Sequence, residues 1–169
     1  NTAVGFRSLS TNVLGSRSTA IGAGALFAQN PASNADMDNV AVGYEAGAAV
    51  TTGIKNVLIG ALAGDANTTG FNNTAIGYDA MGANTASGAN VAIGYESLKV
   101  YNNTADASHM NVAVGTQAGK ALSTGVENTL IGGTAGDALT DGGANVCVGY
   151  ASGTHDVNHT TGARCTLIG

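Results

Sequence analysis

The chain has 169 residues, of which only 10% are charged, and its formal net charge is −5. Its six Lys and Arg residues are scattered and form no basic stripe, so we expect no nucleic-acid partner. No stretch reaches the roughly 18 consecutive apolar residues of a membrane span, so we expect no membrane insertion in this segment.

A five-residue motif restarts ten times and organises the whole chain. Its order is Asn, then Thr or Val, then Ala, Leu or Cys, then Val or Ile, then Gly, and two of the ten copies have Ser or Cys in place of the Asn. The copies begin at Asn1, Ser18, Asn39, Asn56, Asn73, Asn90, Asn111, Asn128, Asn145 and Cys165. The steps between starts are 17, 21, 17, 17, 17, 21, 17, 17 and 20 residues. A fixed period of this length is typical of a solenoid, in which each repeat buries its apolar face against its neighbours. We call the repeats coils 1 to 10 and number their positions as columns, with the Asn in column 1.

Columns 2 to 4 predict a short strand in every coil. β-Branched residues stand in columns 2 and 4, and the side chains of a strand alternate between its two faces. Both faces are apolar, so we expect both to be covered, with column 4 (for example Ile76) forming one buried row along an axis. Column 8 is small and column 9 alternates between Gly and a long apolar residue, which favours a second short strand. No apolar run has helical spacing.

Two columns are expected to build the scaffold. Glycine in column 5 suits a corner at which backbones approach closely, and stacked asparagines in column 1 are expected to form an amide ladder. These structural positions are the asparagines Asn1, Asn39, Asn56, Asn73, Asn90, Asn111, Asn128 and Asn145, and the glycines Gly5, Gly22, Gly43, Gly60, Gly77, Gly94, Gly115, Gly132 and Gly149.

The predicted fold is therefore all-β: one parallel β-solenoid over residues 1–169, with about ten coils and a 17-residue repeat, forming a section of a longer fibre. Its core would be narrow, because Trp is absent and there are only three Phe residues. A narrow core and two apolar strand faces favour a homotrimer, in which one face packs against the other chains. Cys147 and Cys165 are diagonal neighbours on adjacent strands, too far apart for a disulfide, so we predict two free thiols.

The repeat resembles that of a known class of fibrous proteins. The segments NTAIGYDAM, NVAVGYEAG and NVAIGYESL look like the 17-residue repeats of phage tail-fibre and tail-spike proteins and of related bacterial surface proteins. They are similar, more distantly, to the head repeats of trimeric autotransporter adhesins. The resemblance implies a left-handed parallel β-roll with three chains side by side, on a virion tail fibre or a cell surface, and hence an extracellular location.

Three coils carry extra residues, which are expected to form surface loops. The ligand-contact candidates in these loops are Asn30, Asp36, Asp38, Tyr101, Asn103, Asp106, His109, His155, Asp156 and His159. Their side chains suit the hydroxyls of a surface glycan, although a solenoid also tolerates polar loops that bind nothing. His155 and His159 could ligate a metal, but a solvated loop is the better interpretation, so no metal site and no cofactor is predicted.

Two further columns carry polar or aromatic side chains. Four tyrosines share column 6 and could offer sugars an aromatic stripe, but covering a thin core explains them better. Glu45, Asp79 and Glu96 share column 7, where an exposed position explains them and where Asp79 and Glu96 would repel each other mildly. No catalytic constellation is present, and we predict that the chain is not an enzyme.

These observations favour a structural section of a trimeric fibre that attaches to a host or a surface. The partners expected are further copies of the chain, in a homotrimer or a filament, and possible surface glycans. Two alternatives stay open. One is the subunit of a self-assembling extracellular filament, and the other is a carbohydrate-processing tail spike with acidic groups in a side groove.

Overall fold

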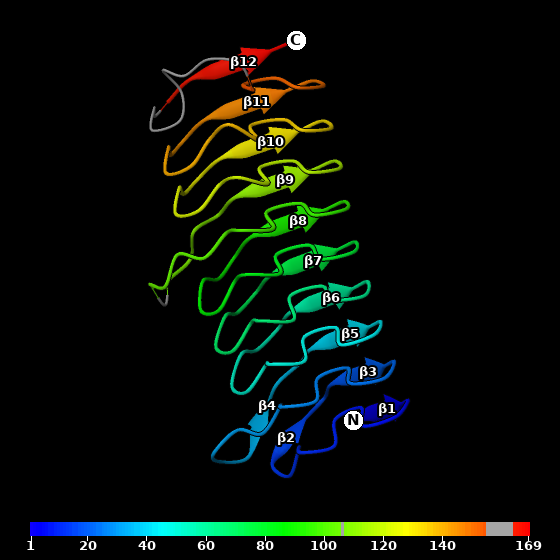
Figure 1. The fold of residues 1–169 in the computed structure, drawn as a ribbon. Coiled ribbons are helices and arrows are strands. Elements are labelled where there is room, and N and C mark those ends of the chain that lie inside the picture. The colour runs from blue at the N-terminus through cyan, green and yellow to red at the C-terminus, as the bar shows by residue number, and fades with distance from the viewer. Residues whose placement is uncertain (106, 155–163) are drawn as a thin grey trace.

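A computed structural model describes residues 1–105, 107–154 and 164–169, and these residues contain strands and turns but no helix. Ten three-residue strands form one parallel sheet that runs the length of a rod (Figure 1). In sheet order they are β1 (Thr2–Val4), β3 (Thr19–Ile21), β5 (Val40–Val42), β6 (Val57–Ile59), β7 (Thr74–Ile76), β8 (Val91–Ile93), β9 (Val112–Val114), β10 (Thr129–Ile131), β11 (Val146–Val148) and β12 (Thr166–Ile168).

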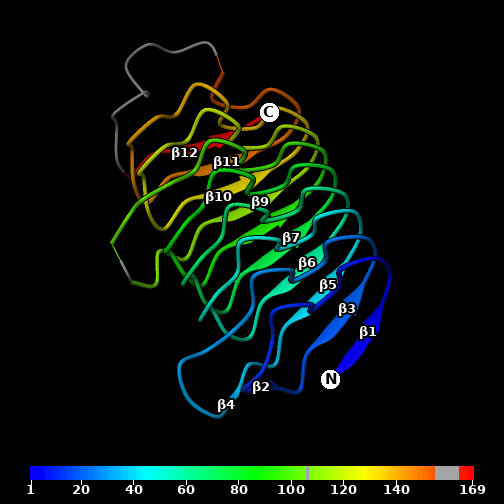
Figure 2. The same ribbon diagram turned by 60° about the horizontal axis from the view of Figure 1, so that its bottom comes forward.

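Each strand pairs with the equivalent strand of the next coil, column on column. Thr74 lies opposite Val91, for example, and Ile76 lies opposite Ile93. The predicted parallel β-solenoid with its spacing of about 17 residues is therefore confirmed. A second small sheet pairs β2 (Gly15–Ser16) with β4 (Ala35–Asp36) near the N-terminal end, where the first insertion leaves the coil (Figure 2). No helix in the described part of the chain has the length and apolar character needed to cross a membrane.

The core lies on the column 3 side of the strands, and the prediction of a buried column 4 row is wrong. Column 3 is fully buried in the inner coils, whereas column 4 is only half-buried, with 41% exposure at Ile21 and Ile131. Ile76 is half-buried like its neighbours. The rod is thin and has a single core, and the alternation of side chains sends column 3 into it and columns 2 and 4 outward. The column 4 residues do form one row, but it lies on the outer face of the sheet.

The segment after the strand is a tight turn and not the second strand expected. Columns 7 and 9 both have positive φ, with values of 52° at Glu96 and 49° at Leu98. Left-handed residues cannot continue an extended strand, and two of them within three positions reverse the chain. The small column 8 residues predicted to face inward, such as Ser97, are buried between them.

The column 5 glycines occupy the corner that ends each strand, as predicted. Gly77 has a φ of 132°, and a Cβ atom added to it would lie 2.4 Å from the backbone oxygen of Gly94 in the next coil. A side chain at this column would therefore be strained by its backbone conformation and would also hold two coils apart.

The column 1 asparagines form the predicted ladder. The side-chain oxygen of Asn111 accepts hydrogen bonds from the backbone N–H and the side-chain amide of Asn128, at 3.0 and 3.1 Å. The amide of Asn128 also donates to the backbone oxygen of Gly142, at 2.9 Å. Each buried amide thus joins its own coil to the preceding coil and closes the far turn of its coil. Asn1, at the end of the ladder, is exposed but makes the equivalent bonds to Ser18 and Gly15.

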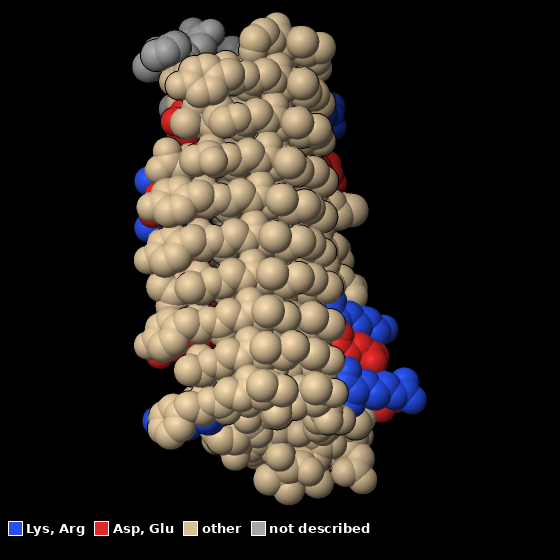
Figure 3. Space-filling model, turned by 90° about the vertical axis from the view of Figure 1, so that its right-hand side faces the viewer, with Lys and Arg blue, Asp and Glu red and all other residues tan. Residues whose placement is uncertain are grey.

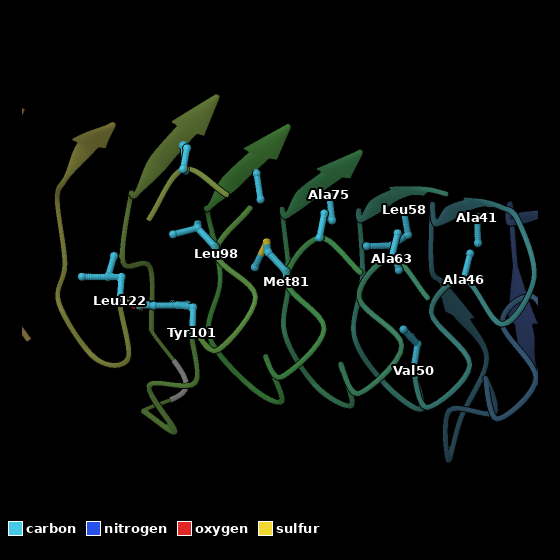
Figure 4. Close-up of a cluster of buried hydrophobic side chains, with 14 of the residues drawn as sticks. Ala41, Ala46, Val50, Leu58, Ala63, Ala75, Met81, Leu98, Tyr101 and Leu122 are labelled. Carbon is cyan, nitrogen blue, oxygen red and sulfur yellow. The ribbon is translucent and has the colours of Figure 1, made fainter. Parts of the chain in front are cut away.

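The core is filled by size compensation between columns 3 and 9 (Figure 4). Leu58 of coil 4 packs against the column 9 glycines of coils 3 and 4, and a Cβ atom on Gly47 or Gly64 would lie 2.5 or 2.8 Å from a Leu58 methyl carbon. Where column 9 is large, as at Met81 and Leu98, column 3 is alanine. Column 12 completes the core with buried side chains such as that of Leu122.

Candidate functional site

The outer face of the ten-stranded sheet is an uncharged surface that runs along the rod. Its columns 2 and 4 contain only Thr, Val and Ile. Figure 3 shows the side toward which the strands point, where a continuous strip without Lys, Arg, Asp or Glu has charged side chains only along its margins. Column 4 is 41% exposed at Ile21 and Ile131 in the inner coils, and 58% and 79% exposed at Val4 and Ile168 in the two end coils. A regular, β-branched and uncharged face of this kind suits packing against another protein surface.

The first insertion forms an ordered polar loop. The Asp36 carboxylate pairs with the Arg17 guanidinium at 3.0 Å and accepts a hydrogen bond from the Ser16 hydroxyl at 2.7 Å. The side-chain oxygen of Asn30 accepts from the backbone N–H of Val13 at 3.1 Å. Asn30 and Asp36 are exposed, and Asp38 is half-buried with a φ of 52°. These polar groups already bond to coil 1, which gives the loop a structural role.

The second insertion differs from the expectation, because two of its candidates lie in the core. Tyr101 is fully buried and His109 is nearly so, with their rings edge to face at a centroid separation of 6.0 Å. Burial raises the pKa of the Tyr101 hydroxyl and lowers that of His109. The insertion wraps the thin core, and these two residues replace its apolar side chains, so neither is available to a surface ligand.

The other candidates of the insertions are not brought together. Asn103 is half-buried and donates to the backbone oxygen of Thr124 at 3.0 Å, so it serves coil 7. Asp106, His155, Asp156 and His159 lie outside the described residues. Within the described part, no group of three or more His, Cys, Asp or Glu residues is arranged to hold a metal ion. Cys147 and Cys165 are free thiols, as predicted.

We expected the carboxylates of Asp79 and Glu96 to repel each other, but a lysine bridges them in a charged ladder along column 7. Lys99 lies between them and contacts Asp79 at 2.9 Å and Glu96 at 2.5 Å, while Lys120 contacts Glu96 at 2.7 Å. Hydrogen bonds from the two lysines and from Gln117 lower the pKa of Glu96 to about 2. The lysines stand in column 10, and the turn at columns 7 to 9 brings that column beside column 7. The role of this ladder is to tie coils 5, 6 and 7 together.

An aromatic notch is the site that the sequence did not predict. It is a pocket of about 310 Å³ on coils 1 to 3, lined by Phe6, Arg7, Ala23, Gly24, Phe27, Tyr44, Glu45 and Ala48. The Arg7 guanidinium carbon lies 4.4 Å from the centroid of the Phe27 ring, which is a cation–π contact. The Glu45 carboxylate raises the pKa of Tyr44 through a hydrogen bond and through its charge.

The notch exists because coil 2 lacks large side chains in two columns. Its residues in columns 6 and 7 are Ala23 and Gly24, whereas coil 1 has Phe6 and Arg7 and coil 3 has Tyr44 and Glu45 at the same columns. Elsewhere two column 6 rings on consecutive coils fill such a space: Tyr78 and Tyr95 stack at a centroid separation of 5.5 Å. The signal available in the sequence was the pair of small residues in columns 6 and 7 of coil 2, between large residues at the same columns of coils 1 and 3.

Comparisons of the chain with protein-family models, with curated proteins and with solved structures find no match.

Proposed function

We propose that this chain is a structural section of an extracellular fibre, on a virion tail or a cell surface, in which three copies pack side by side and attach to a host or a surface. The observation that carries this proposal is the uncharged outer face of the sheet. Its half-exposed Val and Ile side chains repeat at the strand spacing of about 4.8 Å, so they offer another copy a long, regular apolar contact.

The chemistry of that face suits assembly better than ligand recognition. Stable interfaces between identical chains are apolar at their centre and poor in charge. The two margins of the strip differ from its centre, because Arg17, Asp38 and Lys55 precede the strands and the aromatic column 6 follows them. An apolar strip bordered by charged residues on one side and by aromatic residues on the other is the arrangement expected of a subunit contact.

Sedimentation analysis of the purified chain tests the proposal. We expect discrete trimers, and we expect the double variant Thr74→Arg with Ile76→Arg to sediment as a monomer, because the two charges would be buried at the centre of the contact. The variant Thr52→Arg is the matched control, since it adds an Arg to an exposed turn away from the sheet face.

Each other outcome contradicts a specific part of the proposal. A monomeric wild-type chain at high micromolar concentration would refute assembly through this face. Open-ended growth in light scattering would favour the filament alternative. Release of reducing ends from a capsular polysaccharide would favour the tail-spike alternative.

A further inference from the structure

The aromatic notch, defined above by its eight lining residues, has the composition of a small-molecule site. Pockets for small ligands begin at about 300 Å³ and combine aromatic surface with a few polar groups. The notch meets both conditions, with three aromatic rings, one guanidinium and one carboxylate around a volume of about 310 Å³. It lies on the flank beyond the column 5 corner, apart from the outer sheet face.

The spacing of the aromatic residues indicates the thickness of the ligand. Phe6 and Tyr44 occupy column 6 two coils apart, which is about 10 Å at the usual strand spacing. A planar ring between two aromatic rings needs only about 7 Å at van der Waals contact distances of 3.5 Å on each side. A puckered saturated ring, with C–H bonds on both faces, is thicker and occupies the gap more fully.

The charges on the two walls indicate the polarity of the ligand. Arg7 offers only hydrogen-bond donors and Glu45 only acceptors. Because they balance each other, neither an anion nor a cation is favoured over a neutral molecule that both donates and accepts. Neighbouring hydroxyl groups on one ring satisfy this requirement, and the cation–π contact with Phe27 holds the Arg7 guanidinium at the site before a ligand arrives.

We propose that the aromatic notch binds the pyranose ring of a neutral hexose. The ring lies between Phe6 and Tyr44, with its C–H faces against the aromatic side chains, and its hydroxyls bond to Arg7 and Glu45. This inference deepens the attachment role proposed above, because it places a glycan contact at a defined position on the rod. It does not depend on the trimer, since the notch is formed within one chain.

The chain supplies a matched pair of variants for the test. Ala23→Tyr places a third ring between Phe6 and Tyr44 and fills the notch. Ala61→Tyr makes the same change at column 6 of coil 4, between Tyr44 and Tyr78, where column 7 holds the uncharged Leu62. Four coils already carry Tyr in column 6, so both variants are expected to fold.

The experiment titrates the full 169-residue chain with the methyl glycosides of glucose, galactose, mannose and N-acetylglucosamine, followed by amide chemical shifts. We expect at least one glycoside to bind with a Kd in the low millimolar range, shifting the amide signals of coils 1 to 3. Ala23→Tyr should weaken that binding at least tenfold, while Ala61→Tyr should leave the Kd within twofold. Arg7→Gln and Glu45→Gln should each weaken it severalfold.

Three results would overturn the inference. One is the absence of shifts with every glycoside at 50-fold excess, with the protein at roughly 0.2 mM. The second is equal binding by Ala23→Tyr and Ala61→Tyr. The third is binding of glycine betaine in place of the sugars, because it would show that the two charges select a zwitterion. Sedimentation is measured separately, so failure of sugar binding and failure of assembly are distinguishable.

Discussion

Making residue 58 small and residue 64 large, by Leu58→Ala and Gly64→Met, is the sharpest test of how the core is filled. All three atoms nearest to a Cβ added at Gly64 belong to the Leu58 side chain. Leu58 is almost fully buried, so Leu58→Ala should cost about 2–5 kcal/mol of unfolding free energy through the cavity that it leaves. Gly64→Met alone should cost about 1–3 kcal/mol, because the new side chain meets Leu58.

The double variant Leu58→Ala with Gly64→Met should lose less unfolding free energy than the two single variants lose together. It recreates in coil 4 the Ala75 and Met81 pair of coil 5, and the backbone already suits it, since φ is 56° at Gly64 and 53° at Met81. We therefore expect a coupling energy of at least about 1.5 kcal/mol in favour of the double variant, within the usual range for side chains in contact.

Native-state hydrogen exchange is the appropriate assay, because long repeat arrays depart from two-state unfolding. The informative amides are those of Val57, bonded to Asn73 at 2.8 Å, and Gly60, bonded to Val42 at 2.8 Å. The protection free energies of the four proteins give the coupling directly. Additive effects, with a coupling energy near zero, would refute the idea that columns 3 and 9 share one space.

Three further predictions concern the column scaffold and the charged ladder. Asn128→Ala should lower the unfolding free energy by about 3 kcal/mol or more in native-state hydrogen exchange, because the backbone oxygen of Gly142 and the backbone N–H of Asn145 both lose their hydrogen bonds to the Asn128 side chain. Thr52→Arg, at an exposed turn, should change it little. Gly77→Ala should abolish cooperative thermal unfolding monitored by circular dichroism, because its new Cβ would meet the backbone of Gly94 in the next coil. Gly82→Ala should not, because the three atoms nearest to its Cβ all belong to Asp79 of the same coil. Equal melting curves would contradict the close approach of coils at the corner. The ionised Glu96 side chain stabilises the fold fully above its unfolded pKa near 4.5, and this stabilisation is lost as the pH falls toward about 2. The melting temperature of Glu96→Gln should therefore depend less on pH between these two values than that of the wild type. Glu127→Gln, the control, should keep the pH dependence of the wild type.

The sequence predicted the scaffold well because its columns report local geometry directly. Glycine in column 5 and Asn in column 1 each have one dominant structural use in a stacked coil, and both predictions are confirmed. Column 4 was wrongly predicted to face the core, because a strand with apolar residues on both faces does not indicate which face points inward. The choice depends on the volume of the coil interior, which accepts Ala and Leu from column 3 and leaves Val and Ile outside.

The candidate sites were harder to predict because they depend on where coils come together. Tyr101 stands in column 12, whose members Leu122 and Leu139 are buried, so its inward position had a signal in the sequence, whereas nothing in the composition of the second insertion indicates that His109 turns inward. The ladder through Lys99 was missed because columns 7 and 10 become neighbours only through a turn with left-handed residues. The aromatic notch was missed for a related reason: it consists of small residues in coil 2 between large ones in coils 1 and 3.

The size compensation in the core also sets how the length of the rod can change. Leu58 with Gly64 and Leu130 with Gly136 are the same pair, 72 positions apart, and the two four-residue insertions are separated by the same interval. Four coils therefore form one cassette. Removing residues 39–110 would join coil 2 to coil 7 and restore a junction like that between coils 2 and 3, whereas removing coil 3 alone would bring Leu26 against Leu58, which share the space beside Gly47. Recombination could therefore lengthen or shorten such a shaft in steps of this cassette without changing the packing at the junctions.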